Sequence, residues 1–371
     1  MKLKLNPFLS WFSGIIIACV LLQVTTIAIF AWRPNWFFYR AWEYHFMWAN
    51  NSKRTDSRWE GVEKSADSHL YRFYFQEKRR TVVSVDSDGF RSVPAGMGPP
   101  RLFVQGHSNI FGSGISDQET VPWRLAESTG VATFNGAHGK VLSTLSKPAL
   151  GQVELVVDCF HERLFASLPD YLSRYEISND RLQPFEPFAR NDQSLLHLLY
   201  QRPIRPGYWI PDILSRHFKA LKNDFTQYVD PNPRPFPWFE YRVSDTSEQE
   251  FANLMETRRR TIENLGYRYV ALILPSRQTM LGGDTIPEPT ASFGQRLVAV
   301  LKTKDFPIVD LFEPFFRTDP TSVAFRYDFH LNANGAALAA EHIIAGIEHY
   351  HPGWLDSAAT VAPRESVTSI E

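Results

Sequence analysis

The sequence lacks the features that mark several specialised classes of protein. It has 2 cysteines among 371 residues, which excludes a disulfide-dense scaffold and a cysteine-rich zinc site. Neither charge is in excess, because 39 lysines and arginines oppose 40 aspartates and glutamates and leave a net charge of −1. That balance gives no general electrostatic attraction to phosphate backbones, so we expect no nucleic-acid partner. Internal repeats and low-complexity linkers are also missing.

Most of the chain has a globular composition, with 44% hydrophobic and 21% charged residues. The exception is the uncharged run from Trp11 to Trp32. A helix rises about 1.5 Å per residue, so such a run can cross a bilayer core of roughly 30 Å. We therefore predict a cytoplasmic N-terminus over residues 1–10 and a transmembrane anchor over residues 11–32. A cleaved signal peptide and a lipoprotein signal at Cys19 are the alternatives.

The expected location is a single pass through the inner membrane, with the soluble domain in the periplasm. The flanking charges do not fix this orientation, because the two lysines before the run nearly balance the arginines that follow it. Residues 33–80 form an aromatic juxtamembrane segment, in which residues 33–50 suit either a helix packed on the domain or an interfacial helix. The polar residues 355–371 are predicted to be a disordered tail.

Between these ends, short apolar runs alternate with helical patterns. Strands are predicted at residues 102–104, 131–134, 153–157, 269–274 and 308–309, and helices at residues 121–128, 247–265 and 294–301. This alternation favours an α/β fold, a three-layer α/β/α sandwich with a mostly parallel sheet, over residues 81–350. Residues 172–242, rich in proline, arginine and aromatic residues, break the rhythm and are interpreted as an inserted cap region.

Two segments carry candidate chemistry. Ser108 follows the first strand of the predicted sheet in a glycine-rich turn, Gly106-His107-Ser108-Asn109, where a strand end would expose its hydroxyl group. Near the other end, Asp328 and His330 lie two residues apart before a helical run, so the carboxylate could orient the imidazole as a base for a serine. Taken alone, each segment could equally be a capped turn. A metal site lacks further ligands at a recognisable spacing, and we expect neither metal nor cofactor.

Together with the preceding Gly89-Phe90-Arg91, these segments resemble the SGNH/GDSL hydrolase superfamily, over roughly residues 86–159 and 269–346. The resemblance implies Ser108 as nucleophile, His330 as base and Asp328 as its orienter. It also implies an oxyanion hole from the amides of Ser108 and Gly139. Gly136 is the second choice for that glycine.

The sequence departs from the superfamily pattern at two places. His107 replaces the usual aspartate of the first block, so the hydrogen bonding of the turn is expected to differ. The usual asparagine after the third strand is missing, and His161 is the nearby candidate for its oxyanion role. Asn109, His138 and Arg163 are the predicted substrate-binding residues.

The departures and the segment Leu274-Pro275-Ser276-Arg277 are similar to those of the membrane-anchored alginate and polysaccharide O-acetyltransferase-like branch. That resemblance implies an O-acetyltransferase or esterase that acts on a surface or exported polysaccharide, and it allows for a membrane-bound partner protein that supplies the acyl group. The alternative is a non-catalytic protein of the same fold that binds or assembles glycans.

Overall fold

The computed structural model describes residues 7–32, 57–65, 77–86, 88–137, 141–162, 248–276, 279–280, 293–325 and 330–359. The chain forms two compact units, the first comprising Met1–Arg54, Ala66–Gln76 and Arg190–Pro233 and the second Thr55–Ser65, Glu77–Ala189 and Arg234–Glu371. The described part of the first unit is helix α1 (Pro7–Trp32). Within the described ranges, no helix combines the length and the apolar character needed to cross a bilayer. The transmembrane anchor predicted for residues 11–32 is therefore not confirmed.

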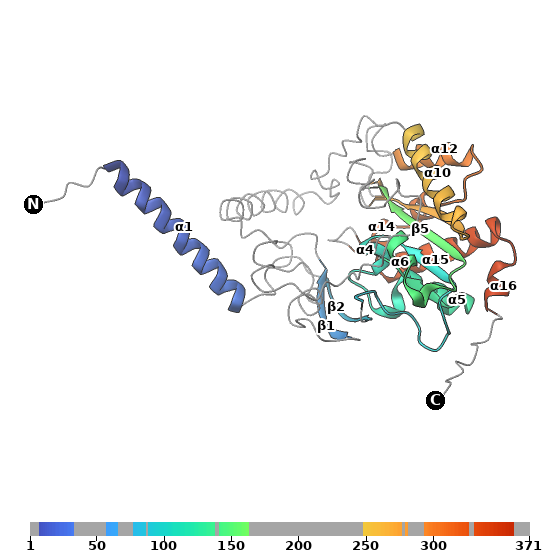
Figure 1. Ribbon diagram of the computed structural model, residues 1–371, viewed down its shortest axis with the longest axis horizontal. Coiled ribbons are helices and arrows are strands. Elements are labelled where there is room, and N and C mark those ends of the chain that lie inside the picture. The colour runs from blue at the N-terminus through green and yellow to red at the C-terminus, as the bar shows by residue number, and fades with distance from the viewer. Residues whose placement is uncertain are drawn as a thin grey trace, which may run out of the picture. The chain divides into compact units, whose positions relative to one another are not determined.

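The second unit is built on a parallel sheet of five strands (Figure 1). Its strands are β3 (Leu102–Gln105), β4 (Thr133–Asn135), β5 (Leu155–His161), β6 (Arg268–Leu274) and β7 (Ile308–Asp310). They lie in the order β4-β3-β5-β6-β7, and each pairs in parallel with its neighbours. The predicted α/β class with a mostly parallel sheet is thus confirmed, and the inserted cap predicted at residues 172–242 lies outside the described residues.

An antiparallel pair of strands, β1 (Ser57–Ser65) and β2 (Glu77–Val85), precedes the sheet. Both strands belong to the second unit, so the domain start predicted at residue 81 falls inside β2. The aromatic segment predicted over residues 33–80 consequently overlaps the folded domain, and its remaining residues are not described. Strand β1 was not predicted because its sequence is polar. One face of the strand is largely exposed to solvent, with Val62 57% exposed.

Helices cover both faces of the five-stranded sheet. They are α4 (Ser108–Phe111), α5 (Val121–Thr129), α6 (Val141–Leu145), α10 (Glu248–Asn264), α12 (Phe293–Lys302), α13 (Phe312–Phe316), α14 (Pro320–Val323), α15 (Ala333–Tyr350) and α16 (Trp354–Ala359), with short 3-10 turns η3 (Asp117–Glu119) and η4 (Pro148–Leu150). Figure 1 shows α10 and α12 together, apart from α5, α15 and α16. The predicted helices at residues 121–128, 247–265 and 294–301 correspond to α5, α10 and α12.

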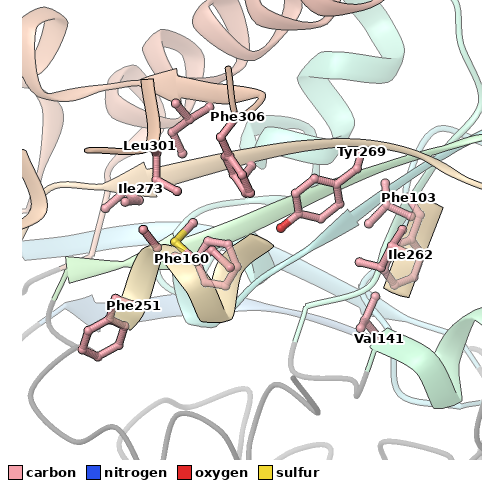
Figure 2. Close-up of a cluster of buried hydrophobic side chains, with 14 of the residues drawn as sticks. Phe103, Val141, Phe160, Phe251, Ile262, Tyr269, Ile273, Leu301 and Phe306 are labelled. Carbon is pink, nitrogen blue, oxygen red and sulfur yellow. The ribbon is translucent and has the colours of Figure 1, made fainter. Parts of the chain in front are cut away.

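The core between the sheet and helices α6, α10 and α12 is apolar and closely packed (Figure 2). It includes Phe103 of β3, Phe160 of β5 and Tyr269 of β6, each fully buried. Alternate residues of each strand face this layer, as the two-residue period of a strand requires. On the opposite face, Gly346 of α15 lies so close to β7 that a Cβ atom would come within 2.3 Å of Val309 Cγ2.

One polar group lies within this core, on the central strand. Asp158 is completely buried, and its Oδ2 accepts hydrogen bonds from Arg258 Nε of α10 at 2.5 Å and from the Tyr269 hydroxyl group at 3.2 Å. A buried carboxylate requires such partners, because removing them would leave an uncompensated charge. The ion pair therefore fixes the position of α10 along the sheet.

The C-terminal segment is ordered further than its polar sequence predicts. Helix α16 begins at Trp354, whose indole is buried and donates a hydrogen bond to Glu154 Oε2 at 2.9 Å. The Ser357 and Ala358 carbonyl groups accept hydrogen bonds from Arg101 Nη1. The disordered tail predicted from residue 355 is therefore wrong for residues 355–359, and residues 360–371 lie outside the described residues.

A glycine substitution tests the packing around β3. A Cβ atom at Gly136 would lie 2.3 Å from Phe103 Cζ, a fully buried ring stacked on Phe134 at 5.8 Å. We expect Gly136→Ala to lower the free energy of unfolding by about 1–3 kcal/mol, the usual cost of overpacking. Urea denaturation with the extrapolated free energy measures this change.

Gly151→Ala is the matched control. Its Cβ atom would lie 3.4 Å from the nearest heavy atom, and its φ of −63° suits alanine. The control should stay within about 0.5 kcal/mol of the natural chain. If the two substitutions lowered the free energy of unfolding equally, the packing at position 136 would not depend on the absence of a side chain.

Candidate active site

The candidate nucleophile lies at the point where the sheet reverses its direction of winding. Numbered along the chain, the five parallel strands have the order 2-1-3-4-5, so the first strand, β3, lies beside the third, β5. In such sheets ligands bind beyond the carboxyl ends of these two strands. Ser108 follows the carboxyl end of β3, and His161 is the last residue of β5.

The turn between β3 and α4 is tight because Gly106 has no side chain. A Cβ atom there would lie 2.4 Å from Ile110 Cγ1, which belongs to the helix that the turn begins. Ser108 is the first residue of α4 and is only partly exposed. Amide groups in the first turn of a helix have no acceptor within the helix, so the Ser108 amide is placed to donate elsewhere.

His107 is the N-cap of α4, and its imidazole Nδ1 accepts a hydrogen bond from the Asn109 amide at 3.3 Å. Short polar side chains such as aspartate usually perform this task. The structure therefore explains how a histidine can stand at this position: an unprotonated ring nitrogen supplies the acceptor. The His107 ring also contacts the edge of His161, with the ring centroids 4.8 Å apart.

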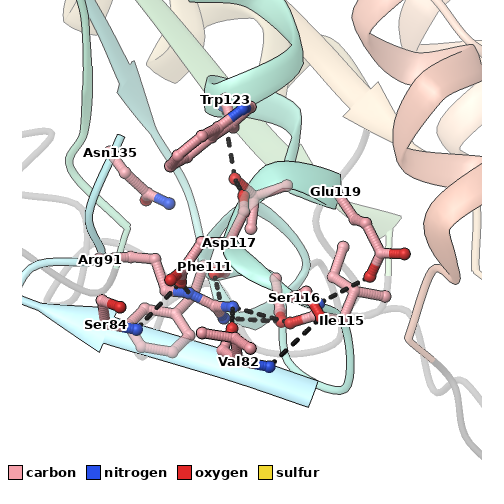
Figure 3. A network of polar contacts seen from close by, with 12 residues as sticks. Val82, Ser84, Arg91, Phe111, Ile115, Ser116, Asp117, Glu119, Trp123 and Asn135 are labelled. Atoms are coloured by element: carbon pink, nitrogen blue, oxygen red, sulfur yellow. Dashed lines mark hydrogen bonds and ion pairs between the residues drawn. The ribbon is translucent and has the colours of Figure 1, made fainter. Parts of the chain in front are cut away.

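The far end of α4 is fixed by Arg91, which is fully buried (Figure 3). Its Nε donates to Asp117 Oδ1 at 2.7 Å, and its two terminal nitrogens donate to four backbone carbonyl groups. These carbonyl groups belong to Val82, Phe111, Gly112 and Ile115. All five donor positions of the guanidinium group are thus used.

This arginine network joins the end of α4 and the segment after it to strand β2. Asp117 Oδ1 also accepts the Ser84 amide of β2 at 3.0 Å, and Ser116 Oγ accepts the Val82 amide at 3.2 Å. Burial lowers the pKa of Arg91 from its ordinary value, and the Asp117 carboxylate opposes that change. The sequence identifies Gly89-Phe90-Arg91 only as a motif. The structure shows that Arg91 holds the end of α4 and the segment that follows it.

His330 and Ser108, which lie 222 positions apart in the chain, are brought into contact. His330 Nε2 is 2.7 Å from Ser108 Oγ, and the imidazole is buried. The Phe325 amide donates to the His330 carbonyl at 3.0 Å, which anchors the segment that carries this histidine. Asp328, the predicted orienter of His330, lies outside the described residues.

Asn109, predicted to bind substrate, makes a different contact. Its Oδ1 accepts the Leu331 amide at 2.8 Å, and its side chain is buried, with 3% of the residue exposed. Of the other predicted substrate-binding and oxyanion residues, His138, Gly139 and Arg163 lie outside the described residues. His161 ends β5 beside His107, so its predicted role as a donor agrees with its place and stays a prediction.

Gly136 is removed from the predicted oxyanion donors. Its amide donates to the Val104 carbonyl at 2.9 Å, which extends the pairing of β3 with β4. The glycine is needed at this place because the Phe103 ring lies where a side chain would be. Gly136 is therefore a packing residue, and Gly139 remains the predicted donor of this loop.

A buried carboxyl group that was not among the predicted site residues lies beside these loops. Glu162 follows β5, and its oxygens accept the Ser276 amide at 2.9 Å, the Gly294 amide at 3.3 Å and the Thr279 hydroxyl group. Burial raises its pKa from 4.5 to about 7, and these hydrogen bonds oppose the rise. Its three partners lie more than 110 positions away in the chain, so no local pattern in the sequence reveals this site.

Neither a metal-binding cluster in the described part of the chain nor a known relative adds to the description of this site. The described residues contain no group of three or more histidine, cysteine, aspartate and glutamate side chains that could hold a metal ion. The chain matches no protein-family model, and no curated protein sequence matches it.

Glu162→Gln tests the buried carboxyl group through the pH dependence of stability. Because the folded-state pKa of about 7 exceeds the ordinary 4.5, the folded protein binds the proton more tightly than the unfolded chain does. The stabilisation from this proton is complete below about pH 4.5 and is lost as the pH rises to about 7. At about 1.4 kcal/mol per pKa unit, the full loss amounts to roughly 3–4 kcal/mol, of which about 2–3 kcal/mol falls between pH 5 and pH 8.

Glutamine cannot ionise, so the variant should not lose this stability. The unfolding free energy of Glu162→Gln minus that of the natural chain should rise by roughly 2–3 kcal/mol from pH 5 to pH 8, as measured by denaturant titrations. Glu127→Gln, which removes the same charge from an exposed position of α5, is the control and should give no such trend. Parallel curves for Glu162→Gln and the natural chain would contradict the assigned burial.

Proposed function

We propose that the chain is a serine-dependent acyl-transfer enzyme of the SGNH/GDSL type. The observation that carries this proposal is the 2.7 Å contact between Ser108 Oγ and His330 Nε2 at the carboxyl end of β3. A serine and a histidine at hydrogen-bond distance form the activated nucleophile of covalent catalysis. The strand order supports the same reading, because it places this pair where doubly wound sheets bind their ligands.

In the proposed reaction, Ser108 Oγ attacks the carbonyl carbon of an ester while its proton passes to His330 Nε2. The tetrahedral oxyanion is stabilised by the amides of Ser108 and Gly139, with His161 as an additional donor. The intermediate collapses to an acyl-serine, and the leaving alcohol takes the proton from His330. A water molecule or a sugar hydroxyl group then gives its proton to His330 and attacks the acyl carbon. His330 returns that proton to Ser108 Oγ as the acyl–serine bond breaks. Asp328 is proposed to hold Nδ1 of the imidazole throughout.

The proposed substrates are acyl esters of an exported or surface polysaccharide, with a membrane-bound partner protein as a further source of acyl groups. This choice rests on the sequence resemblance to polysaccharide O-acetyltransferases and on the uncharged run of residues 11–32. It places the catalytic unit on the extracytoplasmic side of the inner membrane. A glycan-binding protein without catalysis is the competing function, and the labelling experiment below separates the two.

Ser108 is expected to react covalently with a fluorophosphonate probe. Ser108→Ala and His330→Ala should each lower ester hydrolysis by about 10³-fold or more, because the two groups act as one unit. For the same reason, the double variant should be little worse than either single variant. The rates of hydrolysis of a small acetyl ester and the mass of the labelled protein provide the measurements.

Ser113→Ala is the matched control, since Ser113 is a buried serine of the same loop whose amide donates to the Ser108 carbonyl at 2.9 Å. This variant should keep both labelling and hydrolysis. A natural chain that is folded yet neither labelled nor active would favour the glycan-binding function instead.

The proposed location is tested by fusing reporters after Glu371. Alkaline phosphatase, which is active only after export, should be active in the fusion, and a green fluorescent protein that folds only in the cytoplasm should be dark. Full fluorescence with no phosphatase activity would place the C-terminus in the cytoplasm and exclude an exported polysaccharide as the substrate.

A further inference from the structure

We propose that Asn109 is a positioning residue that sets the distance between the nucleophile and its base. The inference rests on the proposed function, since it assigns Ser108 and His330 those roles. It replaces the substrate-binding role that the sequence suggested for Asn109. The role is supported by a pair of adjacent hydrogen bonds between two segments that are distant in the chain.

The two bonds run side by side. Ser108 Oγ contacts His330 Nε2 at 2.7 Å, and the next residue on each side makes the second bond, from the Leu331 amide to Asn109 Oδ1 at 2.8 Å. Both bonds span 222 positions of the chain. Because consecutive residues make them, the second bond constrains the first: the loop cannot move along α4 without breaking both.

The loop of His330 is held on its other edge by the segment that ends α14. The Phe325 amide donates to the His330 carbonyl at 3.0 Å, and the Asn332 amide donates to the Val323 carbonyl at 3.1 Å. These contacts join the loop to its own neighbourhood, and they contain no residue of the serine turn. Asn109 supplies a hydrogen bond between this loop and α4 in addition to the contact of Ser108 with His330.

Asn109 is itself held in place by the helix that contains it. Its amide donates to His107 Nδ1 at 3.3 Å, and it lies within α4, whose far end is fixed by Arg91. The side-chain oxygen is engaged by Leu331, and only 3% of the residue is exposed. A group so enclosed suits the fixing of geometry better than the binding of a sugar. A shift of about 1 Å in a reacting group can cost on the order of 10²-fold in rate.

The test compares Asn109→Ala with Asn109→Asp in the full-length chain. Alanine removes the acceptor of the Leu331 amide, so we expect kcat for a small acetyl ester to fall by about 10–100-fold, with little change in KM. Aspartate supplies a carboxylate oxygen in the same place, so it should recover most of the lost rate at alkaline pH. Its negative charge favours protonated His330, so the acid limb of its pH–rate profile should move to higher pH.

Asn253→Asp is the charge-matched control, on the exposed side of α10. It should leave kcat, KM and the pH profile as they are in the natural chain. Amide hydrogen exchange of peptides that contain Leu331 gives a readout that needs no activity, and exchange there should be faster in Asn109→Ala than in the natural chain.

The outcomes separate the two proposals. If Asn109→Ala raises KM and leaves kcat unchanged, Asn109 binds substrate and the positioning role is overturned. The role is equally overturned if aspartate recovers nothing and its pH profile matches that of the natural chain. If the natural chain is folded but inactive, the proposed function fails, and hydrogen exchange decides the rest: unchanged exchange at Leu331 would show that Asn109 does not hold the loop.

Discussion

The buried guanidinium group of Arg91 makes the interactions on which the position of α4, the helix that begins at Ser108, depends. A charge without access to water is stable only if its donors are all met, and here one carboxylate and four carbonyl groups meet them. Those acceptors come from β2, the end of α4, the loop that follows it and η3. The segment between α4 and η3 therefore takes its shape from Arg91, which lies shortly after β2 in the chain.

Polar side chains fasten the other loops at the same edge of the sheet. Glu162 joins the ends of β5 and β6 to the start of α12, and Asn109 joins α4 to the loop of His330. Each of these side chains is buried and accepts backbone amides, so each replaces pairing that the strands no longer provide beyond their ends. Loops built in this way hold side chains in fixed places even though the loops have little regular structure of their own.

The fold class could be predicted from the sequence because strands and helices leave local patterns, and the pairing of Ser108 with His330 was implied by the resemblance to the SGNH/GDSL superfamily. The predictions that the structure corrects concern residues whose partners lie far away in the chain. The strand predicted to end at residue 157 continues to His161, because Arg258 neutralises Asp158 from 100 positions away. Asn109 looked like a ligand for substrate, since nothing near it in the sequence shows that Leu331 is its partner. Likewise, helix α16 was not predicted because the sequence after Trp354 is polar. The helix is stabilised by the burial of Trp354.

The parallel topology has a consequence for biosynthesis. The carboxylate of Asp158 on the central strand meets Arg258 only when 100 further residues have been made, and β6 can pair with β5 only after that. At about 5–20 residues per second, the edge of β5 and its acidic group wait on the order of 5–20 s for their partners. A sheet of such high contact order folds slowly and leaves an apolar edge open in the meantime. The nascent chain therefore exposes this strand edge until β6 has been made and can pair with it.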